Sequence, residues 1–158
     1  MKGSEDPLSN VVVAGFGSSH GDDQAGWRVA AMLKRRIDLP ARVVVVHDAT
    51  QLLDLLPGCE RLIVVDACRT GGDVGSVTRL CWPDQRIAQQ CNHSTHGVSV
   101  AEALQLAAQF ERLPPVVEIY GIEIARAAPG SGVSPTVLHA VIQVESEICE
   151  RLQEMAPA

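Results

Sequence analysis

Four short, mostly apolar runs most strongly constrain how this chain can fold. Each run is rich in valine or isoleucine, which suits a strand buried on both faces. The runs cover residues 11–17, 42–49, 61–68 and 115–124. Segments with apolar residues at helical spacing lie between and after them, at residues 22–36, 50–58, 97–110 and 136–155. This alternation predicts an α/β fold, a three-layer sandwich in which helices cover both faces of a mainly parallel sheet of about five strands.

Residues 74–82 have a different pattern, because apolar and polar residues alternate along them. Such alternation is typical of a half-exposed or edge strand. Only a short glycine-rich turn separates this segment from residues 61–68, whereas a parallel neighbour would need a longer crossover. We therefore predict an antiparallel strand at or near an edge of the sheet, followed by a loop over residues 83–95.

The predicted helices each carry one apolar stripe that suits burial against the sheet. The stripe of the first helix comprises Ala25, Val29, Met32, Leu33 and Ile37. The stripe of the last helix comprises Val137, Val141, Val144, Ile148, Leu152 and Met155. The short helix at residues 50–58 is expected to begin at Thr50 and to end at the Pro57-Gly58 pair.

Length and composition favour one globular domain. The 158 residues fit a single domain, which we place at residues 10–156 after a flexible leader at residues 1–9. The formal net charge of −6 argues against a nucleic-acid partner, which would favour a basic face. No apolar run approaches the ~20 residues that span a bilayer, and the polar, acidic leader is unlike a signal peptide. We therefore expect a cytoplasmic protein with no membrane partner.

Polar residues gather where the predicted strands end. In a doubly wound sheet, ligands bind beyond the carboxyl ends of the strands, commonly between the first and third strands, where the strand order changes direction. The residues at these places are Asp22 and Asp23 after the first strand, Asp66 in the third, and His93 and His96 before a later helix. Two carboxylates and one imidazole suit a divalent metal such as nickel, zinc, iron or manganese, with positions left open for substrate or water.

Each of these residues also has a structural interpretation. Asp22 is well placed to cap a helix, and Asp23 suits the first helical turn. Asp66 can anchor the turn after its strand, and His96 can be a solvated residue at a helix start. The glycine-rich first loop can also cradle a phosphate, with Asp48 at about the distance of a ribose contact. Neither a GxGxxG motif nor a P-loop is present, however.

The order of three segments along the chain resembles the hydrogenase maturation protease family. The segments are GFGSSHGDDQAGWRV, RLIVVDA and STHGVSVAEAL. In the family pattern an acidic element follows a G-x-G loop, an Asp ends a later strand, and a His precedes a helix. The resemblance covers nearly the whole chain and includes residues 119–124 and 133–137. It implies an endopeptidase that removes the C-terminal extension of the large-subunit precursor of a [NiFe] hydrogenase.

The resemblance also implies which residues form the site. Asp23, Asp66 and His96 match the family's three metal-contacting positions and are the expected catalytic residues. Asp23 matches because it lies three residues before Gly26. His96 matches because it stands two residues after Ser94, just before a helix. The metal is nickel that the precursor already carries, so the protease need not hold a metal of its own. The precursor is then the expected partner of a monomeric enzyme.

Two loops depart from the family pattern. Ser18 replaces the usual asparagine after G-x-G, and residues 48–51 (DATQ) contain no glycine where the family often has a Gly-Gly-Thr loop facing the substrate. The unusual His20 in the first loop is either a fourth metal contact or an ordinary loop residue. The altered loop at residues 48–51 motivates an alternative function, a non-catalytic assembly factor or metal-binding chaperone on the same fold.

Overall fold

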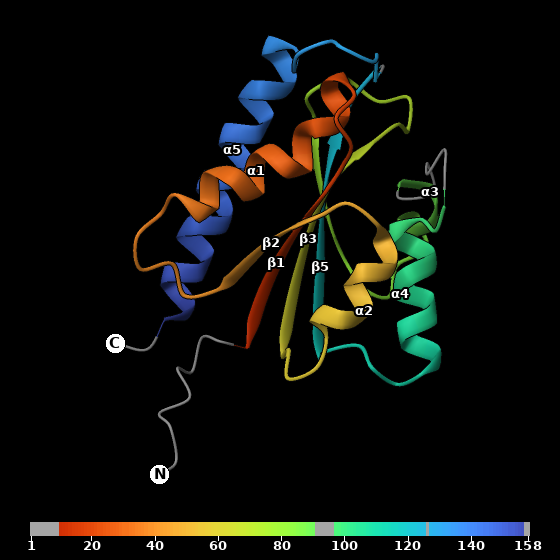
Figure 1. The fold of residues 1–158 in the computed structure, drawn as a ribbon, viewed down its shortest axis with the longest axis vertical. Helices are drawn as coiled ribbons and strands as arrows, with labels where there is room; N and C mark the ends of the chain where they lie inside the picture. The colour runs from red at the N-terminus through yellow and green to blue at the C-terminus, as the bar shows by residue number, and fades with distance from the viewer. Residues whose placement is uncertain (1–9, 91–96, 126, 157–158) are drawn as a thin grey trace.

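The computed structural model describes residues 10–90, 97–125 and 127–156, and Figure 1 shows their arrangement. The strands form a five-stranded sheet in the order β2-β1-β3-β5-β4. They are β1 (Val11–Phe16), β2 (Arg42–Val46), β3 (Arg61–Cys68), β4 (Val77–Cys81) and β5 (Val116–Glu123). Neighbouring strands are parallel except β4, which runs antiparallel to β5 at the edge. The predicted α/β class and the antiparallel edge strand are confirmed.

Helices cover both faces of the sheet (Figure 1). On one face lie α1 (Ala25–Lys34) and α5 (Pro135–Met155), and on the other lie α2 (Leu52–Leu55), α3 (Arg86–Gln90) and α4 (Val100–Gln109). Side chains of β3 alternate between the two cores. Leu62 and Val64 pack with α2 and α4, whereas Ile63 and Val65 pack with α1 and α5. Because side chains alternate along a strand, Asp66 faces the side of α2, α3 and α4.

The predicted loop at residues 83–95 contains a short helix, α3. One carboxylate oxygen of Asp84 accepts a hydrogen bond from the Arg86 N–H at 2.9 Å, which favours the first turn. Ile87 and Gln90, three residues apart, are the buried residues of this helix. The sequence did not predict α3 because two buried positions are too few to show a helical period.

The structure corrects two details of the predicted helices. Ile37 was expected on the apolar stripe of α1 but is 89% exposed, because α1 ends at Lys34. The short helix begins before Thr50, with the 3-10 turn η2 (Ala49–Gln51). Asp48 caps this turn by accepting a hydrogen bond from the Thr50 N–H at 2.8 Å. The Gln51 side chain accepts in return from the Asp48 N–H and completes a capping box.

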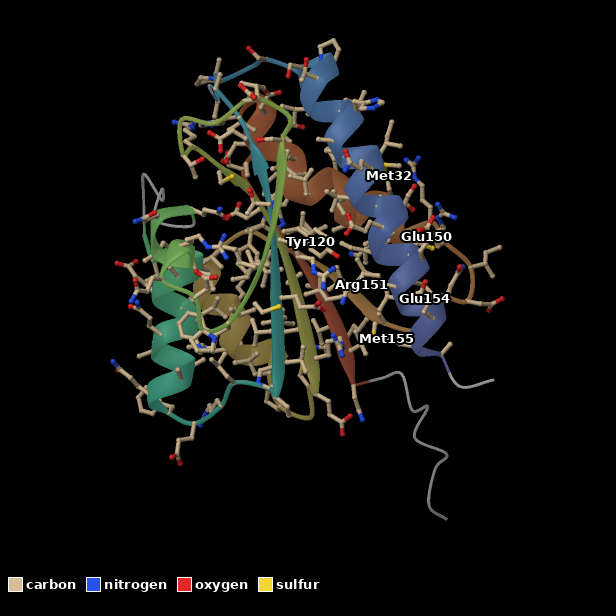
Figure 2. The ribbon with its side chains drawn as sticks, turned by 180° about the vertical axis from the view of Figure 1, so that it is seen from behind. Met32, Tyr120, Glu150, Arg151, Glu154 and Met155 are labelled. Atoms are coloured by element: carbon tan, nitrogen blue, oxygen red, sulfur yellow. The ribbon has the colours of Figure 1, made fainter. Side chains whose placement is uncertain are left out.

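The long closing helix α5 has the predicted amphipathic character. The buried members of its stripe are Val137, Val141, Val144, Ile148 and Leu152, and Met155 packs at their end. Glu150 and Glu154, labelled in Figure 2, are exposed. None of the helices within the described ranges is long and apolar enough to cross a membrane.

A buried ion cluster around Glu118 of β5 ties α5 to the sheet. The Glu118 carboxylate accepts hydrogen bonds from Arg61 at 3.0 Å and from Arg151 at 2.5 Å. Arg79 lies 3.4 Å from the same carboxylate. Arg151 also donates to the Tyr120 hydroxyl at 3.0 Å, and Figure 2 shows it reaching from α5 toward the sheet. Burial by itself would raise the pKa of Glu118, but the hydrogen bonds and charges of Arg151 and Arg61 lower it.

Two glycines allow α1 to lie directly against the strands. A Cβ on Gly26 would lie 2.1 Å from the Phe16 carbonyl oxygen and 2.4 Å from that of Val65. A Cβ on Gly15 would lie 2.3 Å from the Gly26 oxygen. These distances are far below van der Waals contact, so both positions need glycine. The close packing holds the turn before α1, named η1 (Gly21–Gln24), against β3.

Candidate active site at the carboxyl edge of the sheet

The strand order changes direction at β1, which lies between β2 and β3. Ligands of doubly wound sheets bind beyond the carboxyl ends of the strands at such a point. Here η1 follows β1 and contacts β3. It brings Asp23 to the edge at which Asp66 stands, near the end of β3. The structure therefore places these two predicted site residues together.

The first loop orients Asp23. The Ser18 hydroxyl donates a hydrogen bond to Asp23 Oδ2 at 2.5 Å. The backbone closes the same loop, because the Ser18 N–H donates to the Asp23 carbonyl oxygen at 3.2 Å and the Asp23 N–H to that of His20 at 3.0 Å. Gly17 permits this closeness, since a Cβ there would lie 2.4 Å from the Asp23 carbonyl oxygen. A carboxylate held by a neighbouring hydroxyl is oriented before any ligand arrives.

Asp66 has an unusual protonation equilibrium. Burial raises the pKa of the Asp66 carboxyl to about 7, and the nearby charge of Asp23 is the second largest cause. A hydrogen bond from the Ala67 N–H lowers this pKa but does not offset the other two effects. The two carboxylates are therefore close enough to repel each other. Among the described residues, neither forms a salt bridge with a basic side chain. A pair of carboxylates without a cation favours the binding of positive charge.

Asp22 has a structural role that distinguishes it from Asp23. Its side chain is buried, and its carboxylate accepts hydrogen bonds from the Ser134 N–H at 2.6 Å and the Ser134 hydroxyl at 2.9 Å. Ser134 is the N-cap residue of α5, so Asp22 connects η1 to the last helix instead of capping its own. Both carboxylate oxygens of Asp22 accept hydrogen bonds from Ser134. Of the two neighbouring residues Asp22 and Asp23, Asp23 is therefore the one that is available to a ligand.

An Asp22→Asn variant is expected to lose about 2 kcal/mol of unfolding free energy, because it weakens two hydrogen bonds to a buried charged group. Urea denaturation measures this loss. The matched control is Asp54→Asn, which changes an exposed carboxylate of α2 and should stay within about 0.5 kcal/mol of wild type. A fully stable Asp22→Asn protein with no peptidase activity would contradict the structural role and make Asp22 a ligand.

Glu123 at the end of β5 holds the loop that follows β3. One carboxylate oxygen accepts hydrogen bonds from the N–H groups of Thr70, Gly71 and Gly72 at 2.8, 2.9 and 3.2 Å. The other oxygen accepts from the Thr70 hydroxyl at 2.9 Å and the Cys68 thiol at 3.3 Å. Burial by itself would raise the pKa of Glu123, but these hydrogen bonds lower it. The loop is thereby fixed to β5, which steadies the carboxyl end of β3.

The predicted histidines are placed less completely. His93 and His96 lie outside the described residues, and His96 as the third site residue stays a prediction. The His20 side chain is exposed and makes no capping hydrogen bond to η1. Within residues 10–90, 97–125 and 127–156, no group of three or more His, Cys, Asp or Glu side chains has the arrangement of a metal site.

Comparison with models of protein families matches residues 27–151 to HycI, the hydrogenase maturation protease. This range covers well over half of the chain. The chain belongs to the hydrogenase maturation protease family. The resemblance found in the sequence is confirmed, and the protein is a peptidase. The matched range includes Asp66 and His96 and begins after Asp23.

Solved structures of other maturation proteases share this fold. The hydrogenase maturating endopeptidase HybD from E. coli has 19% identity and a TM-score of 0.76, over 92% of this chain and 93% of that chain. The [NiFe] hydrogenase maturation protease HycI from Thermococcus kodakarensis has 19% identity and a TM-score of 0.70, over 92% and 93%. A hydrogenase 2 maturation peptidase from a Thaumarchaeota archaeon has 24% identity and a TM-score of 0.65, over 92% and 99%. No curated protein sequence matches the chain.

Two residues that support the site of this maturation protease were missed by the sequence analysis. Ser134 carries a local signal, since it precedes a proline at the first position of a helix. Its partner Asp22 is 112 residues away along the chain, and no local sequence pattern can reveal a contact between residues so far apart. Glu123 carries a clearer signal, because an acidic residue inside an apolar run must find hydrogen-bond donors when it is buried.

Proposed function

We propose that this maturation protease removes the C-terminal extension of a [NiFe] hydrogenase large-subunit precursor that already carries nickel. Asp23, Asp66 and His96 contact the nickel of the precursor. The metal belongs to the substrate, and its presence signals that insertion is complete. Cleavage therefore follows nickel insertion and does not precede it.

The observation that carries this proposal is the pairing of Asp23 with Asp66 at the carboxyl edge of the sheet. The charge of Asp23 adds to burial in disfavouring the charged form of Asp66, and neither carboxylate forms a salt bridge in the described part of the chain. A precursor with nickel brings positive charge to this pair, whereas a precursor without nickel does not. Oxygen and imidazole ligands suit nickel and leave positions for ligands that the precursor supplies.

Hydrolysis requires a water molecule to add to the peptide carbonyl carbon while the carbon–nitrogen bond breaks. We assign the orientation of this water to one of the two carboxylates, which can accept its proton as the new carbon–oxygen bond forms. The proton then passes to the leaving amine. One of the two carboxylates is therefore assigned to the chemistry as well as to nickel recognition.

The proposal predicts nickel-dependent cleavage. A candidate precursor is incubated in its nickel-loaded and nickel-free forms with the wild-type protein and with an Asp66→Ala variant. Mass spectrometry of the precursor should show loss of one discrete C-terminal peptide only when nickel and wild-type protein are both present. The Asp66→Ala sample controls for a contaminating peptidase.

Three other results would contradict the proposal in different ways. Equal cleavage of nickel-loaded and nickel-free precursor would remove nickel recognition while keeping the peptidase. An intact precursor that co-purifies with the protein would favour the non-catalytic assembly factor. If the protein neither cut nor bound any precursor tried, the proposed action on a hydrogenase precursor would fail.

A further inference from the structure

Gln90, at the end of α3, is a buried polar residue that the site described above does not use. The residue is 8% exposed. In the part of the chain that the structure describes, its Oε1 atom is buried and has no hydrogen-bond partner. A buried amide oxygen without a donor destabilises the folded state, so its retention in a folded protein calls for a reason.

The oxygen of Gln90 lies over Gly121 of β5. An ideal Cβ on Gly121 would be 3.1 Å from Gln90 Oε1 and 3.1 Å from Cys68 Sγ. Glycine at this position therefore leaves room for the amide. The Cys68 thiol already donates to Glu123 at 3.3 Å, which leaves the amide oxygen without that donor.

Gly121 also fixes where the amide stands relative to the site. It pairs in register with Asp66 of the neighbouring parallel strand. Paired residues of a parallel ladder present their side chains to the same face of the sheet, and for these strands it is the face of α2, α3 and α4. The unpartnered oxygen thus lies on the same face of the sheet as the Asp66 carboxyl, one strand away.

We propose that Gln90 is a substrate-binding residue whose Oε1 accepts a hydrogen bond from a backbone N–H of the precursor. This inference rests on the proposed function, because it requires a polypeptide substrate beside Asp66. An amide oxygen is only an acceptor, so its ligand must supply a donor, and an extended peptide offers an N–H at every residue except proline. Since no hydrogen bond within the described residues holds this oxygen, an N–H of an incoming peptide would give it its first partner.

A Gln90→Met variant tests this assignment, because methionine keeps an unbranched side chain of similar length without the amide. The KM for nickel-loaded precursor is expected to rise about tenfold, equivalent to about 1.4 kcal/mol, with kcat within about twofold of wild type. Thermal unfolding of the free variant should occur at or above the wild-type temperature, because an unsatisfied polar group has been removed. Gln89→Met, at the exposed neighbouring position, is the matched control and should leave KM unchanged.

The outcomes separate this inference from the function on which it rests. A Gln90→Met protein that unfolds at clearly lower temperature than wild type would show that the amide is a structural group. A Gln90→Met protein with the same KM as wild type would show that the amide does not bind the substrate. A fall in kcat at constant KM would also overturn the binding role. If the wild-type protein cuts no precursor, the proposed function fails and the inference fails with it, whereas normal cleavage by both proteins defeats the inference alone.

Discussion

An Asp66→Asn protein is expected to cut its precursor at least about 100-fold more slowly than wild type, yet to resist urea better at pH 8. The first effect follows because the amide carries no negative charge to meet nickel and cannot take a proton from water. Burial and the charge of Asp23 raise the pKa of Asp66 to about 7, so its ionisation opposes folding. The variant lacks this ionisation and should therefore resist urea better at pH 8. Function and stability are thus expected to change in opposite directions at this one residue.

The pH dependence of this gain has a definite sign. The folded protein holds the Asp66 proton up to a pKa of about 7, whereas the unfolded chain loses it near the ordinary value of 3.8. The folded state therefore binds more protons between these values, and wild-type stability falls as the pH rises through this interval. Each pKa unit is worth about 1.4 kcal/mol, which sets an upper limit of about 4 kcal/mol. Relaxation and water entry reduce such penalties, and we expect a gain of about 2 kcal/mol above pH 7.

Urea denaturation at pH 4.5 and pH 8 measures this difference. The gain of Asp66→Asn over wild type should be small at pH 4.5 and near its maximum at pH 8. Asp54→Asn, an exposed substitution, controls for a general effect of removing negative charge from a protein with a net charge of −6. A gain that is equal at both pH values would contradict the raised pKa, and full peptidase activity would remove Asp66 from the site.

A Gly26→Ala substitution is expected to remove about 4 kcal/mol or more of unfolding free energy. The added methyl group would meet the Phe16 and Val65 carbonyl oxygens at 2.1 and 2.4 Å. Both neighbours are backbone atoms of central strands, so neither can move without disturbing the sheet. Because domains of this kind are stable by only about 5–15 kcal/mol, poor recovery of folded protein is an equally expected result.

Gly132→Ala is the matched control for this substitution. A Cβ at Gly132 would have no neighbour within 4 Å, so the same chemical change should leave stability within about 1 kcal/mol of wild type. Circular dichroism during urea titration compares the two variants. A Gly26→Ala protein as stable as the control would show that α1 does not need its close approach to β1 and β3.

The sequence predicted most of the fold because the strands carry strong local patterns. The run at residues 61–68 became β3 with the predicted limits, and the alternating segment at residues 74–82 contains the antiparallel edge strand β4. Prediction failed where local signals were weak. The helix α3 has two buried positions, and Ile37 continued a stripe beyond the point at which α1 ends.

The candidate site was predictable in part. The position of Asp66 at a strand end pointed to the correct edge of the sheet, as the topology rule for doubly wound folds requires. The distinction between Asp22 and Asp23 came from the family resemblance, and its physical basis is a pair of hydrogen bonds to Ser134. The burial of Gln90 was not predictable, because it depends on how α3 lies over β5.

The connection between Asp22 and Ser134 spans 112 positions of the chain, and this distance has a consequence for biosynthesis. During synthesis from the N-terminus, the acidic turn is made first, whereas the residue that anchors it follows 112 positions later. Contacts between distant segments also form slowly, since a long loop must close before they are gained. The acidic turn that carries Asp22 and Asp23 therefore lacks this anchor until α5 has been made. An enzyme proposed to test the completion of another protein thus gains the anchor of its own acidic turn only after α5 exists.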